Sequence, residues 1–177
     1  MSKSYLLDTN ILSWLVIGLN NQDSEIGKNV LNNYQAVQAS NIFICSATTG
    51  EIIYGLEVAP PPNDVLKQKE VQDILDIFKV VFSIDKNIAA NHYALLRAKI
   101  FKKYAPKDAK QRAKTNYIEE WCDPTTGKNL GINENDVWIA AVALAHNLTL
   151  VTADKMDHII SVAPPNLSIE NWTFQMS

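Results

Sequence analysis

Short apolar runs that alternate with helical patterns are the feature that most restricts the fold of this chain. Five runs have the length and composition of buried strands, namely residues 5–8, Ile42–Cys45, Val80–Ser83, Leu148–Val151 and the shorter Leu167–Ile169. Between them, apolar residues recur at helical spacing over residues 11–19, 24–39, 47–58, 65–78, 86–104 and 133–146. Strands that alternate with helices predict a parallel sheet covered on both faces. We therefore expect an α/β protein, a single-domain three-layer α/β/α sandwich around a central, mostly parallel sheet of four to five short strands.

The length and composition are those of one globular domain. The 177 residues are 47% hydrophobic and 20% charged, which argues against disorder. We expect one domain over residues 1–177, with an insertion or lid at about residues 105–131, where the sequence is polar and carries the turn sequence Asp123-Pro-Thr-Thr-Gly127.

Several classes of protein are excluded by what the sequence lacks. No apolar run approaches the roughly 18 residues that cross a bilayer, and the N-terminus has no signal-peptide pattern. Cys45 and Cys122 form no CxxC pair, which excludes a disulfide framework and a zinc site of that type. We expect a cytoplasmic protein that does not associate with membranes.

Four acidic residues, Asp8, Glu51, Asp136 and Asp154, lie where an expected strand gives way to a helix or turn. Because the carboxyl ends of parallel strands share one edge of the sheet, we expect these side chains to converge. Two carboxylates about 5 Å apart repel by roughly 3 kcal/mol at an effective dielectric constant near 20. Such a cluster needs protons or a cation, so the sequence predicts a site for a divalent metal ion.

Each acid also has a structural interpretation. Asp8 precedes a helix and suits an N-cap, and Asp154 suits a turn. Thr48–Glu51 and Asn133–Asp136 both have the spacing of a capping box. Capping and metal binding are compatible, because a helix that starts beside a strand end is also where sites form.

Four segments together resemble the PIN-domain nucleases, especially the VapC-type toxins of prokaryotic toxin–antitoxin pairs. They are Leu7-Asp8-Thr9-Asn10, Glu51-Ile52 with Gly55, Asn135-Asp136-Val-Trp-Ile-Ala-Ala141 and Val151-Thr152-Ala-Asp154. The closing residues 167–172 are similar as well. The resemblance covers almost the whole chain except residues 105–131, a stretch longer than in the compact toxins, and it implies a PIN-like fold.

The resemblance also implies a function, that of a metal-dependent endoribonuclease acting as the toxin of such a pair. Asp8 and Asp136 would bind Mg²⁺ or Mn²⁺, and Glu51 and Asp154 would complete the shell, partly through water. Thr152 and Asn10 would orient carboxylates or the attacking water. The same resemblance implies an RNA substrate, an antitoxin protein as partner, and a homodimer.

A basic stretch could contact RNA. Half of the 16 basic residues lie within 18 positions, namely Arg97, Lys99, Lys102, Lys103, Lys107, Lys110, Arg112 and Lys114. This stripe either follows a phosphate backbone or is a solvated helix face. The nearby Tyr117 and Trp121 either stack on bases or cover an apolar patch of the insertion.

Two other functions stay open at this point. One is a non-catalytic PIN-like scaffold that binds RNA or protein. The other is a haloacid dehalogenase-like phosphatase, which is disfavoured because Asn10 stands where such an enzyme has a second aspartate. Among the histidines, His92 and His146 are expected to be structural, and His158 is the one that could approach the acids.

Overall fold

A five-stranded sheet forms the centre of the protein, with its strands in the order β3-β2-β1-β4-β5. The computed structural model describes residues 3–20, 23–37, 41–58, 65–78, 80–108 and 117–175. The strands are β1 (Tyr5–Leu7), β2 (Ile42–Cys45), β3 (Val81–Phe82), β4 (Thr149–Val151) and β5 (Ser168–Glu170). Each neighbouring pair is parallel. The expected α/β class and parallel sheet are therefore confirmed.

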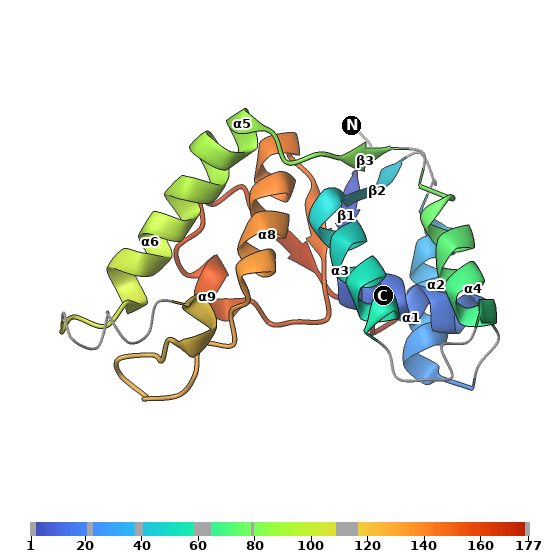
Figure 1. Cartoon of the computed structure of the whole chain (residues 1–177), viewed down its shortest axis with the longest axis horizontal. Coiled ribbons are helices and arrows are strands. Elements are labelled where there is room, and N and C mark those ends of the chain that lie inside the picture. The colour runs from blue at the N-terminus through green and yellow to red at the C-terminus, as the bar shows by residue number, and fades with distance from the viewer. Residues whose placement is uncertain are drawn as a thin grey trace.

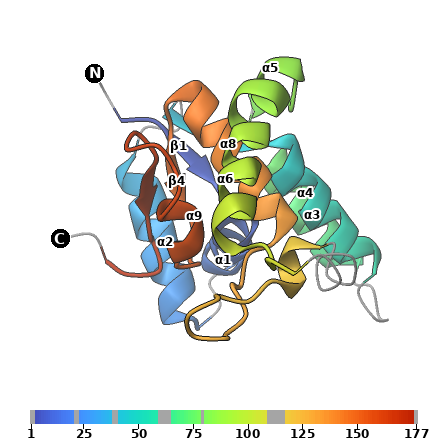
Figure 2. The same ribbon diagram turned by 90° about the vertical axis from the view of Figure 1, so that its left-hand side faces the viewer.

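Helices lie on both sides of this sheet, as Figures 1 and 2 show. On one side are α1 (Thr9–Leu19), α2 (Glu25–Ala36) and α4 (Val65–Leu75). On the other are α5 (Lys86–Ile88), the π-helical turn η2 (Ala89–Tyr93), α6 (Ala94–Tyr104), α8 (Glu134–His146) and α9 (Asp157–Ile160). Helix α3 (Ser46–Glu57) contacts both α1 and α8. None of the described helices is long and apolar enough to span a membrane.

Alternating side chains of the short strands supply both halves of the core. In β1, Leu6 packs with the residues of α6 and α8, whereas Leu7 packs with those of α1 and α2. Leu150 and Val151 of β4 divide in the same way. Since successive side chains of a strand point to opposite faces, a fully buried strand is apolar at every position. The β1 side chains are apolar because they enter one of two cores, and β4 follows the same pattern apart from the buried Thr149.

The described structure differs from the sequence expectations in detail. The expected helix over residues 86–104 contains the π-helical turn η2, where Tyr93 stacks on Trp138 of α8. Residues 109–116 of the expected insertion lie outside the described part. Residues 117–131, with the 3₁₀ turn η3 (Ile118–Glu120), place Ile118 and Trp121 in the core with α6 and α8. The division into a domain and a lid stays a prediction.

Helices α1 and α2 cross closely at two glycines, and this contact yields a stability prediction. A Cβ atom on Gly18 would lie 2.4 Å from the backbone oxygen of Gly27. We expect Gly18→Ala to lower the free energy of unfolding by about 1–3 kcal/mol in urea denaturation, because the two backbones must move apart. Gly55→Ala is the matched control, since no atom of the described residues, its own helix backbone apart, would lie within 4 Å of the new Cβ. A loss as large in Gly55→Ala would contradict this explanation.

Candidate metal centre

The acidic residues gather where the direction of the chain across the sheet reverses. Strands β1 and β4 are neighbours in the sheet, but the connection from β1 leads to β2 on one side and that from β4 to β5 on the other. In parallel α/β sheets ligands bind outside the carboxyl ends of the strands at such a point. Asp8 directly follows β1, and its backbone N–H donates to the Val151 carbonyl oxygen at 2.9 Å. Asp154 follows β4 by three residues.

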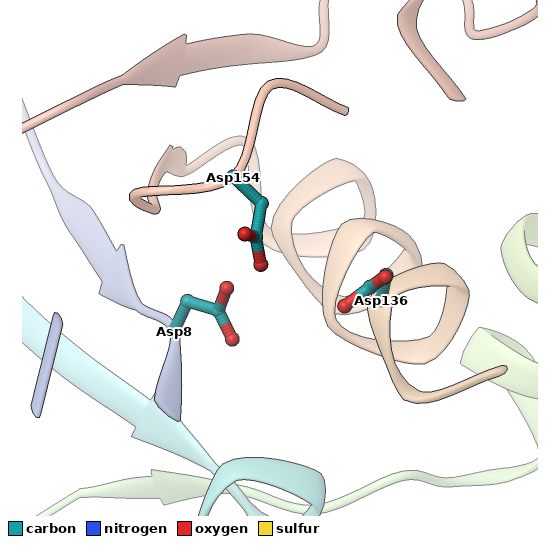
Figure 3. A group of neighbouring side chains, drawn as sticks. All are labelled: Asp8, Asp136 and Asp154. Atoms are coloured by element: carbon teal, nitrogen blue, oxygen red, sulfur yellow. The ribbon is translucent and has the colours of Figure 1, made fainter. Parts of the chain in front are cut away.

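Three aspartates from three separate segments point toward one another at this place. Asp8, Asp136 and Asp154 each offer a carboxylate oxygen, and these atoms lie within 4.8 Å of one another. Figure 3 shows Asp8 at the end of β1, Asp154 in the loop after β4 and Asp136 in the first turn of α8. Asp8 is only 3% exposed, whereas Asp154 is exposed. The centre is therefore buried on one side and open to solvent on the other.

Asn10 connects the segments that carry two of these aspartates. Its Nδ2 donates to Asp8 Oδ2 at 3.1 Å and to Asp154 Oδ2 at 2.9 Å. Its Oδ1 accepts from the Ala153 backbone N–H at 3.0 Å. The Thr152 hydroxyl donates to Asp8 Oδ2 at 2.7 Å. Asn10 and Thr152 thus hold the carboxylates in place, which is the arrangement expected of groups that surround metal ligands.

Glu51, the fourth acid predicted to converge, is not in the group whose oxygens lie within 4.8 Å, but its charge acts on Asp8 and Asp136 and two partners hold its side chain. It accepts hydrogen bonds from the Thr9 hydroxyl and from Asn135 Nδ2, the latter at 2.7 Å. No role for Asn135 was predicted from the sequence. Asn135 precedes Asp136 at the start of a helix, which could have marked it as a site residue. Its partner Glu51 lies 84 positions away, so the contact itself was not predictable.

The capping box predicted at Thr48–Glu51 is wrong. Strand β2 runs into α3 without a loop, so the helix begins at Ser46 and its N-cap, Cys45, makes no side-chain capping bond. Thr48 is fully buried within the helix, and its hydroxyl donates to the Leu7 carbonyl oxygen at 3.3 Å. Glu51 consequently lies in the second turn, where its side chain reaches Thr9 and Asn135 instead of the helix start.

The capping box predicted at Asn133–Asp136 is confirmed. The Asn133 backbone N–H donates to Asp136 Oδ2 at 2.8 Å, and the Asn133 side chain accepts from Asn135 N–H at 3.0 Å. Asp136 has a second carboxylate oxygen. One aspartate can therefore both cap α8 and contribute to the centre.

Burial and crowding disfavour charge on two of the aspartates. Burial raises the pKa of Asp8 to about 6, with a further increase from the charges of Glu51 and Asp154 and an opposing effect of the Thr152 and Thr9 hydrogen bonds. Burial likewise raises the pKa of Asp136 to about 7, and the Asp8, Asp154 and Glu51 charges add to it against the Asn133 hydrogen bond. A cation would stabilise the ionised forms. These hard oxygen donors suit Mg²⁺ or Mn²⁺.

The histidines lie apart from this acidic cluster. His158, the histidine that could have approached the acids, instead places its Nδ1 3.2 Å from the Tyr104 hydroxyl and does not belong to the group of converging aspartates. The ring of His146 stacks on Phe82 with centroids 3.9 Å apart, in agreement with a structural role.

The basic stretch is divided between structural and exposed residues. Arg97 pairs with Glu134 and lies over the ring of Trp121. Trp121 is 3% exposed and packs in the core with α6 and α8, so it is buried and does not stack on bases. Lys99, Lys102, Lys103 and Lys107 are exposed on or just after α6. Lys110, Arg112 and Lys114 lie outside the described residues.

The sequence model of the PIN domain matches residues 5–161. The chain belongs to the PIN-domain family. This assignment confirms the resemblance that the four acidic segments indicated and the PIN-like fold that it implied. No curated protein matches the sequence.

Solved structures share this PIN fold over nearly the whole chain. FitAcB from Neisseria gonorrhoeae is 21% identical, covers 95% of this chain and 97% of its own, and superposes with a TM-score of 0.63. VapBC2 from Rickettsia felis, bound to a DNA fragment from its promoter, is 24% identical, with coverages of 95% and 98% and a TM-score of 0.62. DNA-bound VapBC from Salmonella typhimurium is 21% identical, with coverages of 97% and 99% and a TM-score of 0.60.

Proposed function

We propose that this PIN-domain protein is a Mg²⁺- or Mn²⁺-dependent endoribonuclease that hydrolyses phosphodiester bonds of RNA. The observation that carries the proposal is the convergence of Asp8, Asp136 and Asp154, whose carboxylate oxygens lie within 4.8 Å of one another at the switch point of the sheet. Asp8 and Asp136 also cap helices, but capping does not require three carboxylates to converge, and each of them destabilises the charge of the others. A bound cation would offset this repulsion and so account for the convergence of the three carboxylates.

Each residue of the proposed metal centre would have a distinct role. Asp8, Asp136 and Asp154 bind the ion, while Glu51, held by Thr9 and Asn135, completes the shell through water. Asn10 and Thr152 keep the carboxylates oriented. The bound ion would lower the pKa of its water and neutralise charge that grows on the phosphate.

The toxin of a toxin–antitoxin pair is the biological role we propose, with an antitoxin protein as partner, a homodimeric state and a cytoplasmic location. The support is the four-segment resemblance to VapC-type toxins together with the fold shared with the VapBC structures. Exposed lysines of α6, among them Lys99 and Lys102, would contact the RNA backbone. Arg97 is excluded from that role because it pairs with Glu134.

Removal of the metal tests the proposed chemistry directly. We expect the purified protein to cleave an end-labelled single-stranded or structured RNA in the presence of Mn²⁺ or Mg²⁺. EDTA should abolish cleavage, and excess Mn²⁺ should restore it. Cleavage that persists in EDTA would contradict a metal-dependent mechanism. RNA binding without cleavage under any metal condition would identify a non-catalytic scaffold instead.

A further inference from the structure

A second polar cluster lies at the start of α8 and includes none of the proposed metal ligands. Its centre is Glu134, the first residue of α8, which accepts a hydrogen bond from the Tyr93 hydroxyl. Arg97 Nε donates to both Glu134 carboxylate oxygens, at 3.1 and 3.3 Å. The Glu134 backbone N–H donates to Glu119 Oε1 at 2.9 Å. These contacts attach the start of α8 to η2, α6 and η3.

The two side chains that hold Glu134 are themselves fixed by aromatic rings. Tyr93 stacks on Trp138, with ring centroids 3.5 Å apart and planes inclined by 3°. The guanidinium of Arg97 lies 4.6 Å from the ring centroid of the buried Trp121. The Arg97 and Glu134 side chains are only 21% and 34% exposed. A planar guanidinium stacked on a ring keeps its direction better than a mobile surface lysine would.

The turn that Glu134 begins carries two residues of the centre. Asn135 donates to Glu51 at 2.7 Å, and Asp136 supplies one of the three converging carboxylates. Consecutive residues of a helix move together, because their backbone is fixed by the same hydrogen bonds. A displacement of Glu134 would therefore displace Asn135 and Asp136 as well.

We propose that Arg97 is a positioning residue of the metal centre, acting through Glu134 to fix the first turn of α8. The inference rests on the proposed function, in which Asp136 binds the ion. This role and simple electrostatics predict opposite changes in metal affinity when Arg97 is replaced by a neutral residue. A cation near the centre repels a second cation, so loss of the Arg97 charge alone would strengthen metal binding. Loss of its positioning role weakens metal binding.

Titration with Mn²⁺ alone, by isothermal calorimetry, distinguishes these two effects. We expect Arg97→Met to weaken Mn²⁺ binding by about 10–100-fold, the range typical of residues that hold metal ligands in place. Lys99→Met is the matched control, because it removes a positive charge from an exposed position of the same helix. Its Mn²⁺ affinity should stay equal to that of the wild type or rise. Tyr93→Phe, which changes no charge, should give a smaller weakening.

Hydrogen exchange of the metal-free protein supplies a readout that does not depend on Mn²⁺. The amides of Asn135 and Asp136 should exchange faster in Arg97→Met, whereas those of residues 142–144 near the end of α8 should be unchanged. Faster exchange of amides throughout the protein would show that Arg97→Met is destabilised as a whole. In that case Mn²⁺ titration and hydrogen exchange of Tyr93→Phe decide whether the contacts of Glu134 position the first turn of α8.

These measurements distinguish a failure of this inference from a failure of the proposed function. Wild-type protein that binds no Mn²⁺ would overturn the proposed function and the inference with it. Wild-type binding with equal or tighter binding by Arg97→Met would overturn the inference alone. Weaker binding together with local acceleration in the first turn of α8 would support it.

Discussion

Asp8→Asn and Asp136→Asn are each expected to reduce metal-dependent RNA cleavage by more than about 100-fold, because substitutions of residues that merely support metal ligands already cost about 10–100-fold. Each change removes a proposed ligand charge but keeps the size of the side chain. The fold should survive, because both carboxylates are crowded by other acids and burial raises the pKa of each. The melting temperature of each metal-free variant should therefore equal or exceed that of the wild type. Gel-based cleavage assays and thermal unfolding measure the two effects.

Asp73→Asn is the matched control for these substitutions. Asp73 is exposed on α4 and does not belong to the cluster, so this variant should cleave RNA like the wild type. A collapse of the unfolding transition in Asp8→Asn or Asp136→Asn would show that the aspartates act as structural caps. Full activity in either variant would remove that residue from the metal centre.

The metal-free protein is expected to lose stability as the pH rises from about 4 to about 7. The pKa values of Asp8 and Asp136 are raised to about 6 and about 7 in the folded state, from 3.8. Between these values the folded protein binds more protons than the unfolded chain, so the free energy of unfolding falls as pH increases. One pKa unit corresponds to about 1.4 kcal/mol, so the loss from the two groups together is on the order of a few kcal/mol. Asp136 is half ionised at about pH 7, so the loss is nearly complete about one pH unit higher.

Urea unfolding at pH 5 and pH 8 in the presence of EDTA tests this dependence. The Asp8→Asn/Asp136→Asn double variant isolates the two groups, because all other titrating residues are unchanged. At pH 8 it should be more stable than metal-free wild-type protein, and at pH 5 the difference should shrink. Saturating Mn²⁺ should stabilise the wild type at pH 8 and leave the double variant unaffected. A wild-type protein no less stable at pH 8 than the double variant would contradict the raised pKa values.

The parts of the structure that could be predicted from sequence are those set by local patterns. Short apolar runs located the five strands and helical spacing located the helices around them, because burial of both faces of a strand or of one face of a helix restricts neighbouring residues. The capping box at Asn133–Asp136 was predictable for the same reason, since its partners are three residues apart. The order of the strands in the sheet was not predictable, because a short apolar run does not indicate which strand it pairs with.

The contacts that the sequence did not indicate join remote residues. Glu51 receives its hydrogen bonds from Thr9 and Asn135, which lie 42 and 84 positions away. The alternative interpretation of Glu51 as part of a capping box followed from local spacing alone, and the structure contradicts it. Arg97 has basic neighbours in the sequence and was therefore grouped with candidate RNA contacts, whereas its partner Glu134 is 37 positions away. Local composition describes a segment, but only the packed helices decide which of its charges remain exposed.

Strand β4 enters the sheet between β1 and β5, and Asp154 follows it near the end of the chain. Because Asp8 precedes Asp136 and Asp154 in the sequence, a chain under synthesis has all three aspartates only after α8 and the loop after β4 have been made. Shortened products that stop before Thr149 would leave one edge of β1 unpaired and have only part of the cluster. Synthesis of the loop that follows β4 is therefore the step at which the cluster of three aspartates can form.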